Sequence, residues 1–519
     1  MKSIQERHYA LVPLLLFCGY FTIKALALPL HDIANYYFGG RLLSDGKFSS
    51  EIYFPYWFNT EIAKLGFQQI FASFAPNTPF LALFFSPFSY LDPPSAKALF
   101  NILTTILLLY SISRLAQFYK IKPYYLLLIP AIFCIPLRNN LMFGQVYFLL
   151  FFLLSESWLA YQKGHVKKMA LFLAIAVMLK VFPALLLIIL LLKKSFKGFF
   201  LTIGACVLLI LLSLPFCDPG LWFFYFTKIL SKASCGEIVS AYADNYQSVF
   251  MFLKRLFVFD HIENPNSLFD HPAAADAILL GFKILLLSIG WYVTRKERDN
   301  LKIFSYWIFA AILFSPYGST YTFILLLFPF FSIAGSNIAG WKKLVVAGLL
   351  IAICNLPLAL FLEQPFPLSY TRMFLFVALF GIFVSFSHVT VNWKKVALAA
   401  MLPLLFVLVP KGVKPNNDRL LTDTPALVYD YTIKDEKLTY FFWSEVGASS
   451  NTIPLASKKV VRADLNDGQV YFYGKRITSG DATKLKPMVV NDSLAIYLSD
   501  AGRGIGFYTL RICNISTKQ

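Results

Sequence analysis

Thirteen apolar segments, joined mostly by short loops, run through this chain and restrict it to very few architectures. A helix needs about 20 apolar residues to cross the hydrocarbon core of a membrane, and fewer where protein covers it. The segments lie at 9–30, 95–118, 124–137, 146–162, 169–179, 181–192, 198–216, 275–294, 302–314, 320–335, 342–362, 370–391 and 395–409. This pattern predicts an all-α polytopic membrane protein with about 11–13 transmembrane or half-spanning helices.

The composition supports a membrane protein and argues against a nucleic-acid-binding protein. Hydrophobic residues make up 58% of the 519 residues and charged residues 14%, whereas soluble domains carry roughly 25% charged residues. The formal net charge is +19, but the basic residues are spread over many loops and form no single patch. We therefore expect membrane lipid as a partner, expect no nucleic acid, and predict no particular protein partner.

The charges of the loops predict the side of the membrane on which each loop lies. Short basic loops alternate with longer aromatic loops of mixed charge, and Lys and Arg concentrate in cytoplasmic loops. We place the loops 2–7, 120–122, 163–168, 193–197, 295–298, 342–343 and 394–395 inside, and 31–79, 138–145, 217–274, 315–319 and 363–369 outside. This predicts a multi-pass plasma-membrane protein with a cytoplasmic N-terminus. A cleavable signal peptide is the alternative for the first segment, and Lys24 favours a retained helix.

The C-terminal part of the chain has a different character. Beyond a membrane domain at 1–410, residues 411–519 are rich in β-branched and aromatic residues and predict a small antiparallel β domain outside the membrane. Strands are expected at 428–433, 438–443, 459–465, 470–477, 493–498 and 505–512, with hairpin turns at 466–468 and 501–504. This domain shows no catalytic motif, so we expect capping or partner binding.

The apolar segment 80–91 reads as interfacial or re-entrant.

No cofactor or metal is predicted. The seven cysteines form no CxxC pair and no metal-ligand spacing, and the chain has neither a GxxxxGK[ST] loop nor a GxGxxG opening a soluble βαβ unit. Cys217 and Cys235 fall in one predicted outer loop, where a disulfide and two free thiols are both open. Any reaction must therefore use the membrane and the outer surface.

Asp32 is the first candidate for chemistry, because it directly follows the first apolar segment. A carboxylate at that depth is costly unless it faces water, a partner or a reaction. A general base must ionise and must reach the proton that it removes, and an interfacial Asp meets both conditions when the acceptor enters from outside. A solvated carboxylate at a helix end is the alternative reading.

The first outer loop also carries polar and aromatic candidates for substrate binding. They are His31, Tyr36 and Tyr37, and Arg41 of the same loop is a candidate for binding the donor phosphate. Tyrosine rings offer a flat apolar face with a polar edge, which suits sugars. The same rings also fit an aromatic belt at the membrane surface, and for the aromatic residues alone this second reading is favoured.

Two further clusters lie on the same predicted side. Lys180 interrupts an apolar stretch and Pro183 follows it, so the stretch reads as a hairpin of two half-helices. A buried lysine and the helix N-termini at such a break suit a phosphate, while snorkelling to the interface is the alternative. Arg138 and Gln145 lie in the short loop 138–145. Further candidates follow in the later outer loops, namely Asn245, Gln247, Ser315, Tyr317 and Tyr321.

These residues together resemble a known family. Asp32 with Tyr36-Tyr37, the segment Pro76–Pro87, Gly144-Gln145 and Leu179-Lys180-Val181-Phe182-Pro183 occur in that order, followed by Asn245–Ser248 and Ser315-Pro316-Tyr317. The pattern resembles glycosyltransferase family 87 of the GT-C fold, also labelled DUF2029, over about residues 9–360. Many members carry a His shortly after Ser-Pro, where this chain has Thr320 and Tyr321. His31 is the nearest histidine that could replace it.

The resemblance implies a hexosyltransferase that takes mannose from a polyprenyl-phosphate donor to an envelope glycan or glycolipid on the outer face. Asp32 would be the base, and Lys180, Arg138 or Arg41 would offset the phosphate charge. Gln145 would occupy a family-typical position near the cavity. A transporter or flippase of a lipid-linked saccharide is one alternative, although no repeated halves are evident. An inactive assembly subunit is another.

Overall fold

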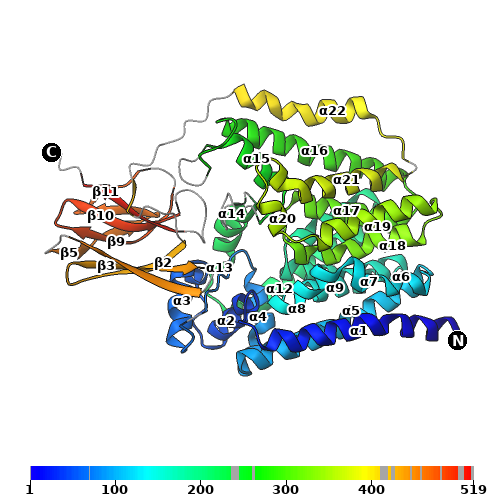
Figure 1. Ribbon diagram of the computed structural model, residues 1–519, viewed down its shortest axis with the longest axis horizontal. Coiled ribbons are helices and arrows are strands. Elements are labelled where there is room, and N and C mark those ends of the chain that lie inside the picture. The colour runs from blue at the N-terminus through cyan, green and yellow to red at the C-terminus, as the bar shows by residue number, and fades with distance from the viewer. Residues whose placement is uncertain are drawn as a thin grey trace.

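The computed structural model consists of a helical body followed by a β region at one end (Figure 1). It describes residues 2–68, 70–234, 236, 245–259, 264–387, 389–408, 419–421, 427–444, 447–455, 459–479, 482–500 and 508–515. The helices extend to residue 408, and the strands begin at residue 419. This arrangement confirms the predicted fold class of a polytopic helical protein with an antiparallel β region.

Among the described residues, five helical segments are long and apolar enough to cross a membrane. They are Tyr9–Leu26 within α1 (Lys2–Leu26), α5 (Pro93–Phe118), α12 with η4 (Phe196–Phe216), α16 (Pro272–Lys296) and η7 with α21 (Leu368–Ser385). The pair Pro123–Ile132 and Cys134–Phe143, which contains α6, α7 and α8, is bent by 64° and would make a sixth span. Phe200 of α12 is 67% exposed, as a lipid-facing side chain would be. The protein is therefore embedded in a membrane.

Shorter helices fill the remaining predicted segments. These are α9 (Tyr147–Gln162), α10 (Val166–Leu179), η3 (Phe182–Leu186), α11 (Leu187–Leu192), α17 (Asn300–Phe314), η6 (Thr320–Leu326), α18 (Leu327–Gly335), α19 (Gly340–Asn355), α20 (Ala359–Leu362), α22 (Trp393–Met401) and η8 (Leu402–Leu408). Fewer helices are of full spanning length than we expected. In α17 the residues from Leu301 to Leu313 are all buried, and a helix covered by protein need not match the thickness of the bilayer.

The first predicted outer loop is folded rather than open. It contains α2 (Ile33–Ser44), η1 (Ser50–Tyr53) and α3 (Pro55–Lys64), and the segment 80–91 forms α4 (Pro79–Phe85) and η2 (Ser86–Tyr90). Phe38 and Phe58 are fully buried in this layer, so apolar packing holds it together. The later outer loop contributes α13 (Leu221–Phe224), the π-helical turn η5 (Tyr225–Ile229), α14 (Leu230–Ser234) and α15 (Val249–Phe257).

In the part of the chain that the structure describes, the β region forms three antiparallel sheets. Their orders are β1-β11-β10-β9-β5, β2-β3-β4 and β6-β7-β8. The strands are β1 (Arg419–Leu420), β2 (Leu427–Lys434), β3 (Lys437–Ser444), β4 (Gly447–Pro454), β5 (Val460–Arg462), β6 (Asp464–Asn466), β7 (Gln469–Phe472), β8 (Lys475–Arg476), β9 (Lys484–Val490), β10 (Leu494–Ser499) and β11 (Thr509–Asn514).

One of the two predicted hairpin turns is confirmed. Asp467 and Gly468 both have positive φ and connect β6 to β7 with Asn466 opposite Gln469, as a two-residue turn requires. The other, at 501–504, lies outside the described residues, as does Cys235 of the possible disulfide.

Among the described residues, β2 packs against α3, and two further side-chain contacts join the β region to the helical body. The rings of Phe71 and Tyr429 lie 6.1 Å apart between centroids. Lys232 of α14 pairs with the buried Asp500, whose Oδ2 is 3.4 Å from the Lys232 Nζ. Both side-chain contacts involve segments that also line a cavity of the helical body.

Candidate active site

A cavity of about 1020 Å³ opens in the helical body at the end that faces the β region. Its walls come from the junction of α1 and α2, the loop 70–78, the break between α10 and η3, α14 and the loop 314–322. These segments are far apart in the chain, so only the folded protein creates the site. Seven predicted residues line it together with Asp32, namely His31, Tyr36, Gln145, Lys180, Ser315, Tyr317 and Tyr321.

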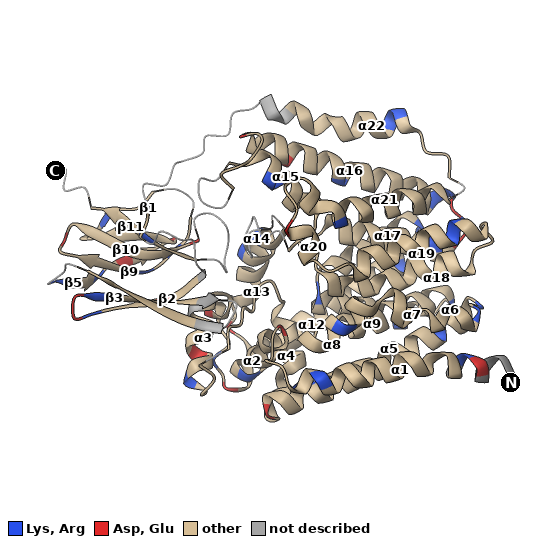
Figure 2. Cartoon of the chain, viewed as in Figure 1, with Lys and Arg blue, Asp and Glu red and all other residues tan. Residues whose placement is uncertain are grey.

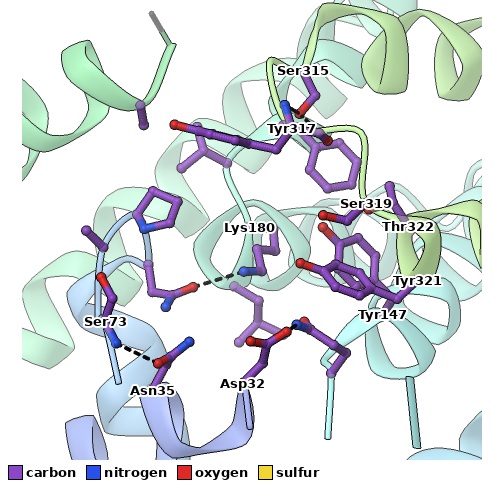
Figure 3. Close-up of a pocket in the computed structure, with 18 of the residues that line it drawn as sticks. Asp32, Asn35, Ser73, Tyr147, Lys180, Ser315, Tyr317, Ser319, Tyr321 and Thr322 are labelled. Carbon is purple, nitrogen blue, oxygen red and sulfur yellow. Dashed lines mark hydrogen bonds between the residues drawn. The ribbon is translucent and has the colours of Figure 1, made fainter. Parts of the chain in front are cut away.

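Asp32 extends its carboxylate into the lower part of the cavity (Figure 3). It occupies the N-cap position of α2, six residues beyond the end of α1. Burial raises the pKa of its carboxyl above the usual range, and the Gln145 hydrogen bond with the charges of Lys180 and His31 opposes this shift only in part. A raised pKa makes the carboxylate a stronger base than a solvated aspartate.

A short relay orients this carboxylate. The Tyr36 hydroxyl donates to Gln145 Oε1 at 2.8 Å, and Gln145 Nε2 donates to Asp32 Oδ2. Because the oxygen of the amide is occupied by Tyr36, its NH₂ group faces the carboxylate. Gln145 is therefore a positioning residue for Asp32.

Gly144 allows Gln145 to reach this place. It ends α8 (Cys134–Phe143) in the left-handed conformation, with φ of 66°, and a Cβ added there would lie 2.7 Å from the Cβ of Ile33. Ile33 is the neighbour of Asp32. The backbone of α8 thus approaches the start of α2 closely, and only glycine satisfies both conditions.

We expect Gly144→Ala to lower both the melting temperature and the activity. Gly164→Ala is the matched control, because Gly164 has φ of 74° but nothing within 4 Å of an added Cβ. In both variants an alanine must adopt the left-handed backbone conformation, which costs about 1–2 kcal/mol. Only the Gly144→Ala side chain also pushes Ile33 away. Thermal unfolding of the purified protein in detergent would measure the difference, and equal losses in the two variants would contradict the close contact.

Lys180 supplies a cation to the same space. α10 ends at Leu179, and Lys180 adopts an extended backbone before η3 begins at Phe182, so the predicted break is confirmed. Its Nζ donates to Asn77 Oδ1 at 2.9 Å and lies 5.5 Å from the centre of the Tyr36 ring. Both partners are neutral, and Lys180 makes no ion pair with Asp32, although both residues are described. Its charge is thus available to an anion in the cavity.

Residues 74–316 match the family model of glycosyltransferase family 87. This part of the chain is a family 87 region. No curated protein matches the chain. Together with the apolar helices, the match supports a membrane glycosyltransferase. Asn77, Gln145 and Lys180 lie inside the matched family 87 region, whereas Asp32 precedes it.

Aromatic and hydroxyl side chains form the opposite wall of this glycosyltransferase cavity. Figure 3 shows Tyr147 and Tyr321 beside Ser319 and Thr322, and the rings of Tyr147 and Tyr321 lie 5.3 Å apart between centroids. Flat rings next to hydroxyls are typical of carbohydrate sites.

Five predicted site residues of the glycosyltransferase do not line the cavity. They are Tyr37, Arg41, Arg138, Asn245 and Gln247. Arg41 pairs with Asp45 at 3.1 Å, the Tyr37 hydroxyl donates to the carbonyl of Leu91, and the Gln247 amide donates to the carbonyl of Ser369. Arg138 and Asn245 are exposed. Each of these side chains points to a partner or to the surface instead of the cavity.

Sequence reasoning missed several lining residues of the family 87 site, including Asn35, Ser73, Asn77, Tyr147 and Thr322. Asn77 stands in Pro76-Asn77-Thr78-Pro79, where a turn with an amide between two prolines was the available signal. Asn35 accepts from the backbone N–H of Ser73 at 2.8 Å and so fixes this loop against α2. Within the part of the chain that the structure describes, no three His, Cys, Asp or Glu side chains gather as metal ligands would.

Proposed function

We propose that this membrane glycosyltransferase transfers a hexose, with mannose as the first candidate, from a polyprenyl-phosphate donor to an envelope glycan or glycolipid. The observation that carries the proposal is the meeting of one carboxylate and one lysine, Asp32 and Lys180, in one cavity of about 1020 Å³. Such a pair provides both a base for the acceptor and a counter-charge for the leaving group.

The donor phosphate would bind at Lys180. Negative charge grows on the leaving phosphate as its bond to the sugar breaks, and a fixed cation stabilises that charge more in the transition state than in the ground state. The lysine is flanked by the apolar lining residues Leu179, Val181 and Phe182, which suit the first isoprene units of a lipid. Arg41 and Arg138 do not line the cavity, so we assign no phosphate contact to them.

Asp32 would act on the acceptor. The acceptor oxygen forms a bond to the anomeric carbon while the bond from that carbon to the phosphate oxygen breaks. The electron pair of the broken bond stays on the polyprenyl phosphate, and the acceptor proton passes to the Asp32 carboxylate. His31 lines the same cavity, and burial followed by the charge of Lys97 lowers its pKa, so it is a neutral second candidate for this proton.

The orientation that fits this reaction places the cavity and the β region outside the cell. Figure 2 shows many of the Lys and Arg residues of the helical body at the end opposite the β region, where the N-terminus also lies (Figure 1). The positive-inside rule assigns such an end to the cytoplasm. A lipid-linked donor presented at the outer face of the plasma membrane would then reach Lys180 directly.

A reconstituted assay with labelled polyprenyl-phosphomannose tests this function. We expect label to appear in an acceptor glycan or glycolipid and the donor to stabilise the purified protein against heat. Movement of the donor across the liposome membrane without transfer would support a flippase instead. The absence of both transfer and stabilisation, with a protein that remains folded, would support an inactive subunit.

A further inference from the structure

A second hollow, of about 590 Å³, lies where α5 and α9 end and where α10 and α12 begin. α9 starts at the cavity-lining Tyr147 and ends at Gln162, and α10 returns over 14 residues to Lys180. At 1.5 Å per residue the hollow therefore lies on the order of 20 Å from the candidate active site. It is a separate site that the transfer reaction does not use.

The hollow concentrates positive charge around one buried carboxylate. Glu156 is 2% exposed, and its two oxygens pair with Arg114 Nε at 3.4 Å and with Lys168 Nζ at 3.1 Å. Glu156 Oε1 accepts no hydrogen bond. Five basic side chains line the hollow, namely Arg114, Lys163, Lys167, Lys168 and Lys197. The carboxylate of Glu156 holds two of them, Arg114 and Lys168, at the hollow.

Three lysines of the hollow remain without an anionic partner. Lys163, Lys167 and Lys197 line it and are exposed, and among the described residues none of them shares an ion pair or a side-chain hydrogen bond. They come from the turn after α9, the start of α10 and the start of α12. Lys163 Nζ also lies 5.9 Å from the centre of the Phe118 ring. Three separate elements thus direct ammonium groups without an ion pair among the described residues to one place, which is an arrangement suited to a phosphate.

The apolar side chains next to the three lysines favour a lipid phosphate over a free phosphate ion. α5 and α12 are spanning segments, so their shared end lies at the level of the lipid headgroups. Leu171 is four residues after Lys167 and Phe200 three residues after Lys197, so each lies on the same helix face as its lysine, one turn deeper in the membrane. These apolar side chains are 49% and 67% exposed. A phosphate at the lysines would therefore carry its acyl chains along an exposed apolar surface.

We propose that this hollow binds the phosphate of an anionic phospholipid of the cytoplasmic leaflet. The lysines hold the headgroup, and the adjoining faces of α10 and α12 hold the acyl chains. Basic residues near a membrane surface attract anionic lipids with about a fivefold gain in affinity each. The loss of all three free lysines should thus weaken binding on the order of 100-fold.

Native mass spectrometry of the full-length protein tests the site, with phosphatidylglycerol, phosphatidylcholine and inorganic phosphate as probes. We expect retention of phosphatidylglycerol alone, and its loss in the triple variant Lys163→Gln/Lys167→Gln/Lys197→Gln. The control Arg298→Gln/Lys394→Gln/Lys395→Gln removes the same charge from exposed positions after α16 and at the start of α22 and should retain the lipid. The corresponding Lys→Arg triple variant should also retain it, which excludes misfolding as the cause of the loss.

Three results would overturn the proposal. Equal retention of phosphatidylglycerol and phosphatidylcholine would mean that charge does not select the lipid. Equal loss in the triple variant and its control would mean a diffuse electrostatic effect. Displacement of the lipid by millimolar inorganic phosphate would identify a site for a free anion instead. None of these readouts depends on sugar transfer, so they are independent of the proposed function.

Discussion

Asp32→Asn is expected to reduce the rate of sugar transfer by about 10²–10⁴-fold, which is the usual contribution of a general base. Asparagine is nearly isosteric and can still contact Gln145, so the cavity should keep its shape while it loses the ability to accept the acceptor proton. Initial rates with labelled donor in detergent-solubilised membranes, normalised to the amount of folded protein, would measure the change. Near-wild-type turnover would exclude Asp32 as the base.

Asp45→Asn is the matched control for this variant. Asp45 is the C-cap residue of the same helix, α2, and its partly exposed ion pair with Arg41 lies outside the cavity. Such surface pairs contribute little to stability, so this variant should retain its activity. A similar loss in both variants would indicate a general effect of altering α2.

The pH dependence gives a second readout of the same assignment. The base works only when deprotonated, and burial raises the pKa of Asp32. The wild-type transfer rate should therefore rise with pH through a midpoint above that of an ordinary aspartate. The residual activity of Asp32→Asn should lack this rise.

Lys180→Gln is expected to lower kcat by about 10²–10³-fold, because electrostatic stabilisation of developing charge contributes on that scale. Gln keeps a hydrogen-bonding group near Asn77 but has no charge to offer the leaving phosphate. Lys180→Arg keeps the charge and should retain more activity than Lys180→Gln. Steady-state kinetics at saturating acceptor would separate kcat from KM for the donor.

The exposed Lys228 of η5 provides the control, because Lys228→Gln removes one charge from the same end of the protein without touching the cavity. A rise in KM with unchanged kcat for Lys180→Gln would show that the lysine only binds the donor in its ground state. An unchanged kcat and KM would remove Lys180 from the proposed mechanism.

The parts of the site that could be predicted are those where one residue conflicts with its apolar surroundings. Asp32 follows an apolar segment and Lys180 lies within one. A charge in such a place is costly in a membrane unless it faces water, a partner or a reaction, and both residues line the cavity. Asn77 carries no such conflict in its own loop. It meets Lys180 across 103 residues of sequence, and that approach becomes visible only in the fold.

For the two arginines, the sequence did not predict the direction of the side chain. Arg41 of α2 and Arg138 of α8 belong to helices next to the site, but a side chain near a site need not point into it. Asp45 lies one helical turn after Arg41 and captures its guanidinium. Arg138 of α8 faces the surface. Charge and location could be predicted from the sequence, whereas side-chain direction depends on local partners.

The β region was predictable where β-branched and aromatic residues mark the strands, and the strand expected at 493–498 is present as β10. β2 and β3 coincide with the expected strands at 428–433 and 438–443. β4 has the sequence GASSNTIP, which lacks bulky alternation, and it is held as a strand by its pairing with β3. β9 contains Pro487, and a proline inside a run argues against a strand when only the sequence is considered.

The contacts of the β region with Phe71 and Lys232 have a consequence for biosynthesis. Asp32 leaves the ribosome well before Tyr429 and Asp500, whose contacts with Phe71 and Lys232 lie beside the cavity. These contacts can therefore form only after residue 500 has been made. A nascent chain that already contains Asp32 and Lys180 would still lack the contacts of the β region beside the cavity.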